Sequence, residues 1–141
     1  MPVATTDFAH VRLTVTDIAR SRKFYDTVFG FDVAFEAPPA DADQATKDQL
    51  AFLFGGVIYA FGGGLLGLRP VAPTGDTFDE DRSGLDHVSF TAPDIASLTD
   101  AAALLDSLGI EHGGVKDIGA GSILEFRDPD NIALELYASA E

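Results

Sequence analysis

The chain contains the same segment twice. Phe8-Ala-His-Val-Arg-Leu-Thr-Val-Thr-Asp-Ile-Ala19 returns as Leu85-Asp-His-Val-Ser-Phe-Thr-Ala-Pro-Asp-Ile-Ala96, so that His10 corresponds to His87 and Asp17 to Asp94, each pair 77 residues apart. A tandem repeat of one supersecondary unit indicates two copies that pack together and share a surface. Both copies carry a histidine on the opening segment, which makes the shared surface a candidate for chemistry.

The repeat predicts an α+β fold of two βαβββ modules. Residues 8–16 alternate between polar and apolar side chains, as a half-buried strand does, and the second copy alternates likewise. Asp17 and Asp94 are candidate helix N-caps, and Gly30 and Gly109 candidate helix ends. The remaining strands are expected to begin at Phe31 and Ile110 and to cover Leu50–Phe54, Val57–Leu68, Ser122–Arg127 and Ile132–Ala138, with a loop over 37–49.

These elements set the expected organisation. A chain of 141 residues is one domain, formed by two half-size modules that share a core. Module one is expected over about 6–72, an acidic linker over about 73–84 and module two over about 85–139. Half-size modules leave sheet surface to cover, so a homodimer is expected. The modules then pair either within one chain or across the dimer.

Composition excludes several classes of function. The formal net charge of −14 would repel nucleic acid. No apolar run is long enough to span a membrane, and the first residues lack the features of a secretion signal. There is no cysteine, which excludes disulfides and thiolate metal sites and fits a cytoplasmic protein. A small-molecule substrate or ligand is the expected partner.

Four motifs in this order resemble the vicinal oxygen chelate superfamily, which includes glyoxalase I, extradiol dioxygenases, fosfomycin-resistance enzymes and bleomycin-binding proteins. They are His10-Val-Arg-Leu-Thr-Val-Thr-Asp17, Lys23-Phe-Tyr-Asp-Thr-Val-Phe-Gly-Phe31, Asp86-His-Val-Ser-Phe-Thr-Ala-Pro-Asp94 and Phe126-Arg-Asp-Pro-Asp-Asn-Ile-Ala-Leu-Glu-Leu136. The resemblance covers nearly the whole chain. It implies a curved mixed sheet around a cavity that holds a divalent metal.

Carried over position by position, the resemblance implies a metal site of His10, His87 and Glu135. The matching position in the last strand of the first module is Gly67, so one ligand of the glyoxalase pattern is missing. Two histidines and one carboxylate favour Fe(II) or Mn(II), with Zn or Ni as alternatives. Glutathione-dependent glyoxalase I is disfavoured by Gly67. A ring-cleaving dioxygenase would have a tyrosine where this chain has Glu125.

Three further residues are candidate substrate contacts: Arg12, Arg69 and Tyr137. Arg12 is two residues from His10 and Arg69 is two from Gly67, so each shares a strand face with a site position. Arginine binds carboxylate and phosphate groups bidentately, which suggests an anionic substrate. The preferred function is therefore a metal-dependent enzyme, with catalytic residues not assigned. The alternative is a protein without metal that binds a drug or metabolite, in which an arginine neutralises Glu135.

Overall fold

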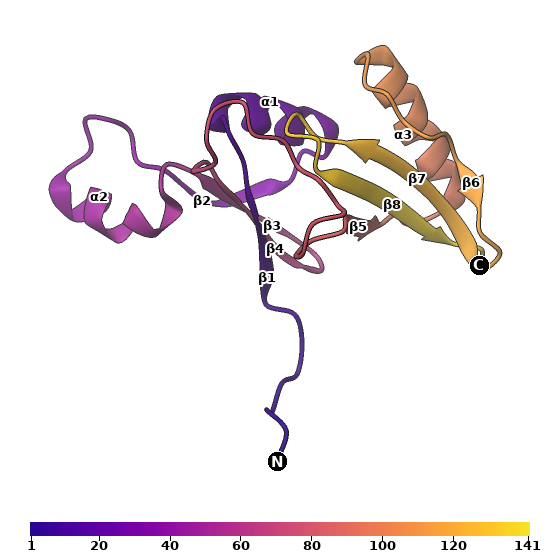
Figure 1. The fold of residues 1–141 in the computed structure, drawn as a ribbon, viewed down its shortest axis with the longest axis horizontal. Helices are drawn as coiled ribbons and strands as arrows, with labels where there is room; N and C mark the ends of the chain where they lie inside the picture. Colours follow the sequence, from indigo (N-terminus) through magenta and orange to yellow (C-terminus); the bar gives the residue numbers. More distant parts are fainter. The chain divides into compact units, whose positions relative to one another are not determined.

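The computed structural model describes residues 1–141 and divides the chain into two compact units, Met1–Gly75 and Asp76–Glu141 (Figure 1). Each unit has the predicted βαβββ order, and each contains a four-stranded mixed sheet. The predicted α+β fold of two modules is therefore confirmed. No helix is both long and apolar enough to span a membrane.

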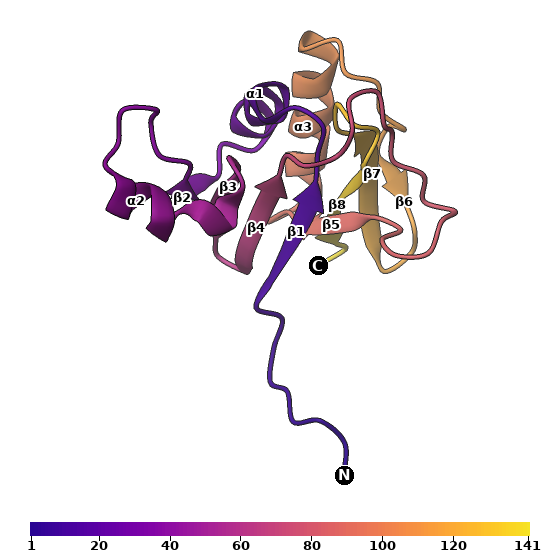
Figure 2. The same ribbon diagram turned by 60° about the vertical axis from the view of Figure 1, so that its left-hand side comes forward.

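Unit 1 contains one sheet with the strand order β1-β4-β3-β2. Its strands are β1 (His10–Thr14), β2 (Asp32–Glu36), β3 (Val57–Phe61) and β4 (Gly64–Arg69). Strand β1 pairs parallel with β4, and the other two pairings are antiparallel. Helix α1 (Ile18–Val28) covers one face of the sheet (Figure 2). Leu13, Tyr25, Tyr59 and Leu66 are buried on that face.

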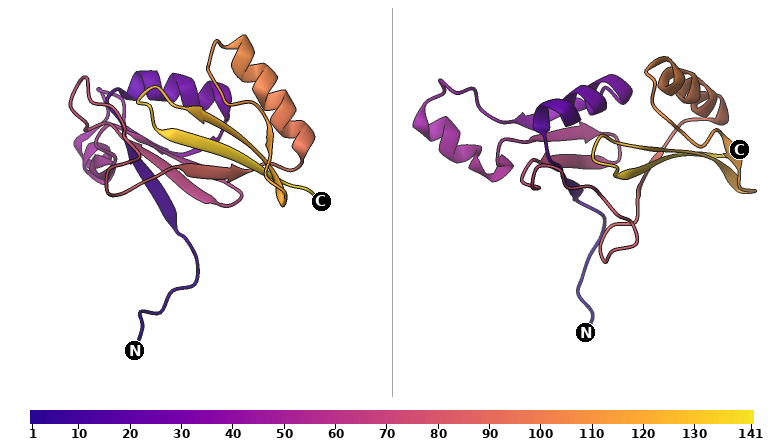
Figure 3. Two further views of the ribbon diagram at one scale, coloured as in Figure 1. Left: turned by 45° about the vertical axis from the view of Figure 1, so that its right-hand side comes forward. Right: turned by 45° about the horizontal axis from the view of Figure 1, so that its top comes forward.

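Unit 2 repeats this topology with the strand order β5-β8-β7-β6. Its strands are β5 (Val88–Thr91), β6 (Lys116–Asp117), β7 (Gly121–Arg127) and β8 (Ala133–Ser139). Helix α3 (Ile95–Ser107) lies along β7 and β8 (Figure 3). Leu98 and Leu105 of α3 are buried, as are Leu124, Phe126 and Leu134 of the sheet.

The predicted helix ends of α1 and α3 are confirmed. The Asp17 carboxylate accepts the Arg20 N–H at 3.1 Å, and Asp94 accepts the Ser97 N–H at 2.8 Å. Gly30 (φ +63°) and Gly109 (φ +69°) follow the helices in the left-handed conformation that glycine adopts without steric cost. The 77-residue repeat therefore extends to the capping geometry.

Four elements differ from the prediction. The expected single strand Val57–Leu68 is two antiparallel strands, β3 and β4, joined by a turn. Leu50–Phe54 is not a strand: it contains the 3-10 helix η1 (Ala51–Leu53), and the preceding segment, predicted to be a loop, contains helix α2 (Gln44–Gln49). Asp43 caps α2 by accepting the Thr46 N–H, and Phe54 and Gly55 end η1 with positive φ. A short apolar run does not distinguish a strand from a buried helical turn. In the second unit, the strand expected to begin at Ile110 is absent as a continuous element. Only β6 and one isolated β-bridge, between His112 and Phe126, are formed there.

Candidate functional site

The sheet face opposite α3 carries the polar side chains of unit 2. Phe90 and Leu134 point to the core under α3, and the alternation of the strands places Ser89 and Glu135 on the opposite face. Ser89 and Glu135 are direct partners in the parallel pairing of β5 with β8. The Ser89 hydroxyl donates a hydrogen bond of 2.7 Å to Glu135 Oε1, so one carboxylate oxygen is held in place.

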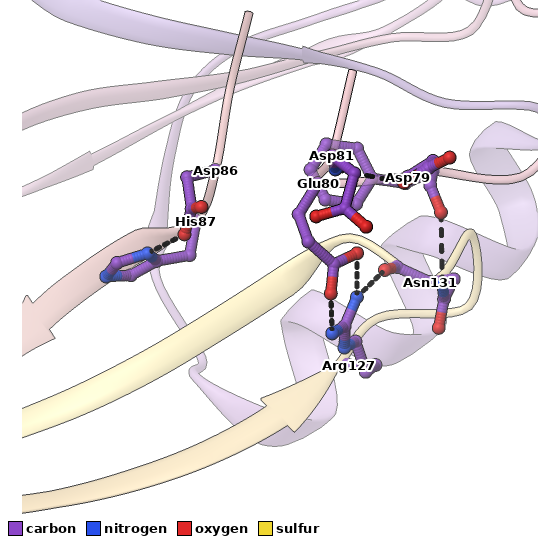
Figure 4. Close-up of polar contacts among 8 residues, drawn as sticks. Asp79, Glu80, Asp81, Asp86, His87, Arg127 and Asn131 are labelled. Atoms are coloured by element: carbon purple, nitrogen blue, oxygen red, sulfur yellow. Dashed lines mark hydrogen bonds and ion pairs between the residues drawn. The ribbon is translucent and has the colours of Figure 1, made fainter. Parts of the chain in front are cut away.

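His87 precedes β5 and lies next to this carboxylate. Its Nε2 is 3.9 Å from Glu135 Oε2. Its Nδ1 is 2.6 Å from Asp86 Oδ1, and Figure 4 shows this contact. The hydrogen bond to Asp86 raises the pKa of His87; partial burial opposes the rise and the negative charge of Glu135 adds to it. With Nδ1–H donated to Asp86, the lone pair of neutral His87 is on Nε2, the nitrogen that faces Glu135.

The pair borders a hollow of about 400 Å³ that is lined entirely by residues of unit 2. The lining is rich in carboxylates, contributed by Glu80, Asp86, Glu111, Glu125 and Glu135. Glu125 and Glu135 are direct cross-strand partners on β7 and β8. Two like charges opposite one another destabilise a sheet unless a cation reduces their repulsion. Lys116 Nζ is 3.6 Å from Glu125, so Glu125 has such a cation, whereas the Glu135 contacts are Ser89 and His87.

One wall of the hollow is fixed by an ion pair between the linker and β7. Both terminal nitrogens of the Arg127 guanidinium group contact Glu80, Nη1 at 3.0 Å and Nη2 at 2.6 Å (Figure 4). This bidentate contact lowers the pKa of Glu80 to about 2. Arg127 Nη1 also donates to the Asn131 carbonyl at 3.1 Å, and the Asn131 amide donates to the Phe78 carbonyl at 3.0 Å. The acidic linker is thereby bound to the turn between β7 and β8.

His112, the third histidine, is held by its own loop. Its Nε2 is 2.8 Å from Asp106 Oδ1, and its Nδ1 accepts the Gly114 N–H at 3.0 Å. The Nδ1 atom is therefore the acceptor and Nε2 carries the proton that is donated to Asp106. Both ring nitrogens have local partners, which is the arrangement of a histidine that stabilises a loop.

In unit 1 the corresponding face carries His10, Arg12 and Thr14, since Leu13 and Val15 point to the core under α1. Arg12 is the direct partner of Gly67 on β4. Its side chain lies across this glycine: a Cβ built at Gly67 would be 2.7 Å from Arg12 Cγ. Arg12 Nη2 donates to the Phe52 carbonyl at 2.6 Å, and Nε is buried with no hydrogen-bond partner.

At equivalent positions in their sheets, the two units have cross-strand residue pairs of different charge. The Arg12–Gly67 pair of β1 and β4 corresponds to the Ser89–Glu135 pair of β5 and β8. A long cation beside a glycine in one unit thus replaces a short hydroxyl beside a carboxylate in the other. This register independently identifies Gly67 as the counterpart of Glu135.

The predicted site residues are divided between the two units. His87 and Glu135 are neighbours in unit 2; Arg12 and Arg69 share a face of unit 1, where Arg69 also contacts the Phe54 ring. His10 is exposed at the start of β1. No group of three or more His, Asp or Glu side chains is gathered as a metal site.

The side chain of Tyr137, the remaining predicted residue, lies against Gly121 on the neighbouring strand β7. Its ring and hydroxyl lie within 3.0 Å of a Cβ built at Gly121, and its hydroxyl is 3.4 Å from the Ala120 carbonyl. Two contact residues were missed at the sequence level, Asp86 and Ser89. The signal was present, because one directly precedes His87 and the other shares the strand face of Glu135.

Known proteins resemble this chain over nearly its full length. The profile of the Glyoxalase/Bleomycin resistance protein/Dioxygenase superfamily matches residues 7–136. The lactoylglutathione lyase of Schizosaccharomyces pombe is 30% identical over 158 aligned positions, which include 98% of this chain and 51% of the lyase. This chain thus spans about half the length of that curated relative.

Solved structures give the same result for the fold. A glyoxylase/bleomycin resistance protein/dioxygenase domain from Frankia sp. EAN1pec is 28% identical, with a TM-score of 0.75 and coverage of 98% of this chain and 95% of that one. A mutant of the fosfomycin resistance protein FosX from Listeria monocytogenes, complexed with Mn(II) and 1S,2S-dihydroxypropylphosphonic acid, is 16% identical, with a TM-score of 0.71 and coverage of 97% and 95%. The chain belongs to the Glyoxalase/Bleomycin resistance protein/Dioxygenase superfamily.

Proposed function

We propose that this chain is a metal-dependent enzyme that acts on a small substrate with two adjacent oxygen atoms. The observation that carries the proposal is the His87–Glu135 pair. Its two facing atoms are 3.9 Å apart, and each side chain is oriented by a second residue, Asp86 for His87 and Ser89 for Glu135. Histidine ligands of metals typically donate their other nitrogen to a carboxylate in this way.

The chemistry of this pair fits a divalent ion. His87 Nε2 and Glu135 Oε2, which lie 3.9 Å apart, are the two atoms that would hold the ion. The carboxylate side chain is 18% exposed and that of His87 is 44% exposed, so both remain accessible from the hollow. Nitrogen from imidazole and oxygen from carboxylate suit Fe(II) and Mn(II) best, with Zn and Ni as alternatives.

The third proposed ligand is His10, the repeat counterpart of His87. The family assignment and the matched register of the two units support this choice. The ligand comes either from the same chain or from a second copy in a homodimer. Gly67 offers no side chain, so the set contains three protein ligands and leaves positions for substrate oxygens. Mn(II) is bound in the FosX complex, which supports a metal of this kind.

A bound ion would act as a Lewis acid toward the substrate oxygens. The residues of the chain supply the remaining functions. Asp86 holds His87 in the tautomer that leaves Nε2 free, and Ser89 holds Glu135 so that Oε2 faces the histidine. Arg12 and Arg69 bind a negative group of the substrate, and Tyr137 contributes to substrate binding beside Glu135. The acidic lining of the hollow in unit 2 attracts cations and disfavours a second anionic group there.

Metal stoichiometry tests the proposal. The wild-type protein is stripped with a chelator, reconstituted anaerobically with Fe(II) or Mn(II), desalted and measured by elemental analysis. One ion per chain is expected for the wild type and for His112→Ala, whose imidazole is bound within its loop. His87→Ala should lose the ion. A wild type that binds no divalent ion but still binds a small ligand would instead be a metal-free binding protein.

A further inference from the structure

Unit 1 contains a group of basic side chains on the sheet face opposite α1. Strands β1, β3 and β4 have no Asp or Glu, although the chain has 23 acidic residues. Arg12 and Arg69 both lie on this face, because Leu66 and Leu68 point into the core on the other side. The fourth strand, β2, places Asp32 on the same face, in the row of Ala60, Leu65 and His10. The part of the face formed by β1, β3 and β4 therefore carries the two arginines and no carboxylate.

The two arginines are diagonal neighbours. Arg12 on β1 is the register partner of Gly67 on β4, and Arg69 on β4 is the partner of Thr14. The two arginines are therefore on adjacent strands with an offset of two residues. Diagonal positions are separated by about 7 to 8 Å, a distance within reach of long side chains. Two arginine side chains that start at such positions are long enough to reach the same small ligand.

One segment holds both guanidinium groups. Arg12 Nη2 donates to the Phe52 carbonyl at 2.6 Å, and the Arg69 guanidinium lies 4.3 Å above the centre of the Phe54 ring. These contacts come from η1 and the residue after it. They orient the cations without neutralising them, because neither a carbonyl nor an aromatic ring carries a negative charge.

Neither arginine has an anionic partner within unit 1. The other paired cations have carboxylates: Arg22 contacts Asp26 and Glu36, and Arg127 contacts Glu80. Arg12 has instead a buried Nε–H that makes no hydrogen bond. A buried donor without a partner is unfavourable. A movement of the side chain that brings Nε–H to an oxyanion would replace this unfavourable state with a charge-assisted bond.

Gly67 creates the space for this arrangement. Any side chain at residue 67 would start 2.7 Å from Arg12 Cγ, so Arg12 can lie flat across the sheet only over a glycine. The same position in unit 2 is occupied by Glu135. Unit 1 thus has a glycine where unit 2 has a carboxylate, and the Arg12 side chain lies over that glycine.

We propose that Arg12 and Arg69 form an oxyanion subsite that binds the carboxylate, phosphate or phosphonate group of the substrate. The assignment of this anion to the substrate rests on the proposed function; the binding of the anion does not. Arg12 is the main contact, through its planar donor fork, and Arg69 adds a second positive charge. The substrate class is thus a small molecule that carries an acidic group in addition to its metal-chelating oxygens.

Anion binding to protein without metal tests the proposal separately from the metal. Inorganic phosphate and malonate are titrated into chelator-treated protein at constant ionic strength, and binding is followed by calorimetry or by NMR. Phosphate reports on phosphate-like groups and malonate on carboxylates. Saturable binding of at least one probe is expected for the wild type. It should weaken about tenfold or more in Arg12→Gln, as expected for loss of a charge-assisted pair.

Matched variants separate the subsite from general charge. Arg82→Gln removes one positive charge from the exposed linker and should change the affinity by less than twofold. Arg12→Lys keeps the charge but loses the fork, so its affinity should fall between those of the wild type and Arg12→Gln. Arg69→Gln provides a second test that leaves β1 intact.

Two results would overturn the proposal. One is the absence of saturable binding of both probes to folded wild type. The other is equal affinity in Arg12→Gln, Arg69→Gln and Arg82→Gln, with folding verified by circular dichroism. Metal affinity should be unchanged in Arg69→Gln, so failure of the anion subsite and failure of the metal site are observed in different experiments.

Discussion

Replacement of Gly67 by alanine tests the contact between Arg12 and the sheet. The new Cβ would lie 2.7 Å from Arg12 Cγ and 3.3 Å from Cδ. Cγ is close to the backbone, so a change of the Arg12 rotamer is required, and the hydrogen bond to the Phe52 carbonyl is lost. Loss of a hydrogen bond from a charged group costs about 1.5–3 kcal/mol. Alanine is about 0.5–1 kcal/mol more favourable than glycine in a strand, so a net loss of about 0.5–2.5 kcal/mol is expected.

A double-mutant cycle isolates this effect. Arg12→Ser copies the residue that unit 2 has at the matching position, Ser89, and removes the steric conflict. In that background Gly67→Ala should be neutral or stabilising, giving a coupling energy of about 1–3 kcal/mol. Urea denaturation followed by circular dichroism measures all four proteins. If Gly67→Ala destabilises the protein equally with Arg12 and with Arg12→Ser, the argument that Arg12 depends on Gly67 is refuted.

Three further predictions concern pH, capping and assembly. Arg127 lowers the pKa of Glu80 from 4.5 to about 2, so Glu80→Gln should reduce the free energy of unfolding fully at pH 7 and by less as the pH falls below 4.5. Urea titrations of both proteins measure this difference, and a difference that is independent of pH would contradict the prediction. Asp94→Ala should cost about 1 kcal/mol by removing the cap of α3, measured by thermal unfolding, with Asp100→Ala on the exposed part of the helix as a near-neutral control. Sedimentation equilibrium at micromolar concentration should show a homodimer, and a purely monomeric protein would disprove this expectation.

The fold was predictable from the sequence because the repeat specifies the same signals twice. The alternation around His10 and His87, the caps at Asp17 and Asp94, and the left-handed glycines Gly30 and Gly109 are local features whose meaning does not depend on the rest of the chain. Each signal in one copy is supported by its counterpart 77 residues away.

The segment without a counterpart was predicted wrongly. Residues 37–54 belong to the first module alone, so no second copy constrains them. The Asp43 cap of α2 was overlooked, and the apolar residues of η1 have the same short pattern as a buried strand. This segment nevertheless supplies the Phe52 carbonyl and the Phe54 ring that hold the two arginines.

The candidate site was predictable only in part. The proximity of His87 and Glu135 follows from adjacent strands with matching register, and the resemblance of the motifs to the superfamily was sufficient to propose it. The roles of Asp86 and Ser89 depend on side-chain rotamers, which a pattern of residue types does not specify. The packing of Arg12 over Gly67 likewise depends on strand register and a short interatomic distance.

The central proposal is that His10, His87 and Glu135 bind one divalent ion. The most direct measurement is anomalous diffraction from crystals of the full chain soaked with Mn(II), with data collected on both sides of the manganese absorption edge. We expect one anomalous peak per chain, within bonding distance of a ring nitrogen of His10, of His87 Nε2 and of the Glu135 carboxylate. A fully soaked crystal with no peak, or with peaks only at other side chains, would contradict it.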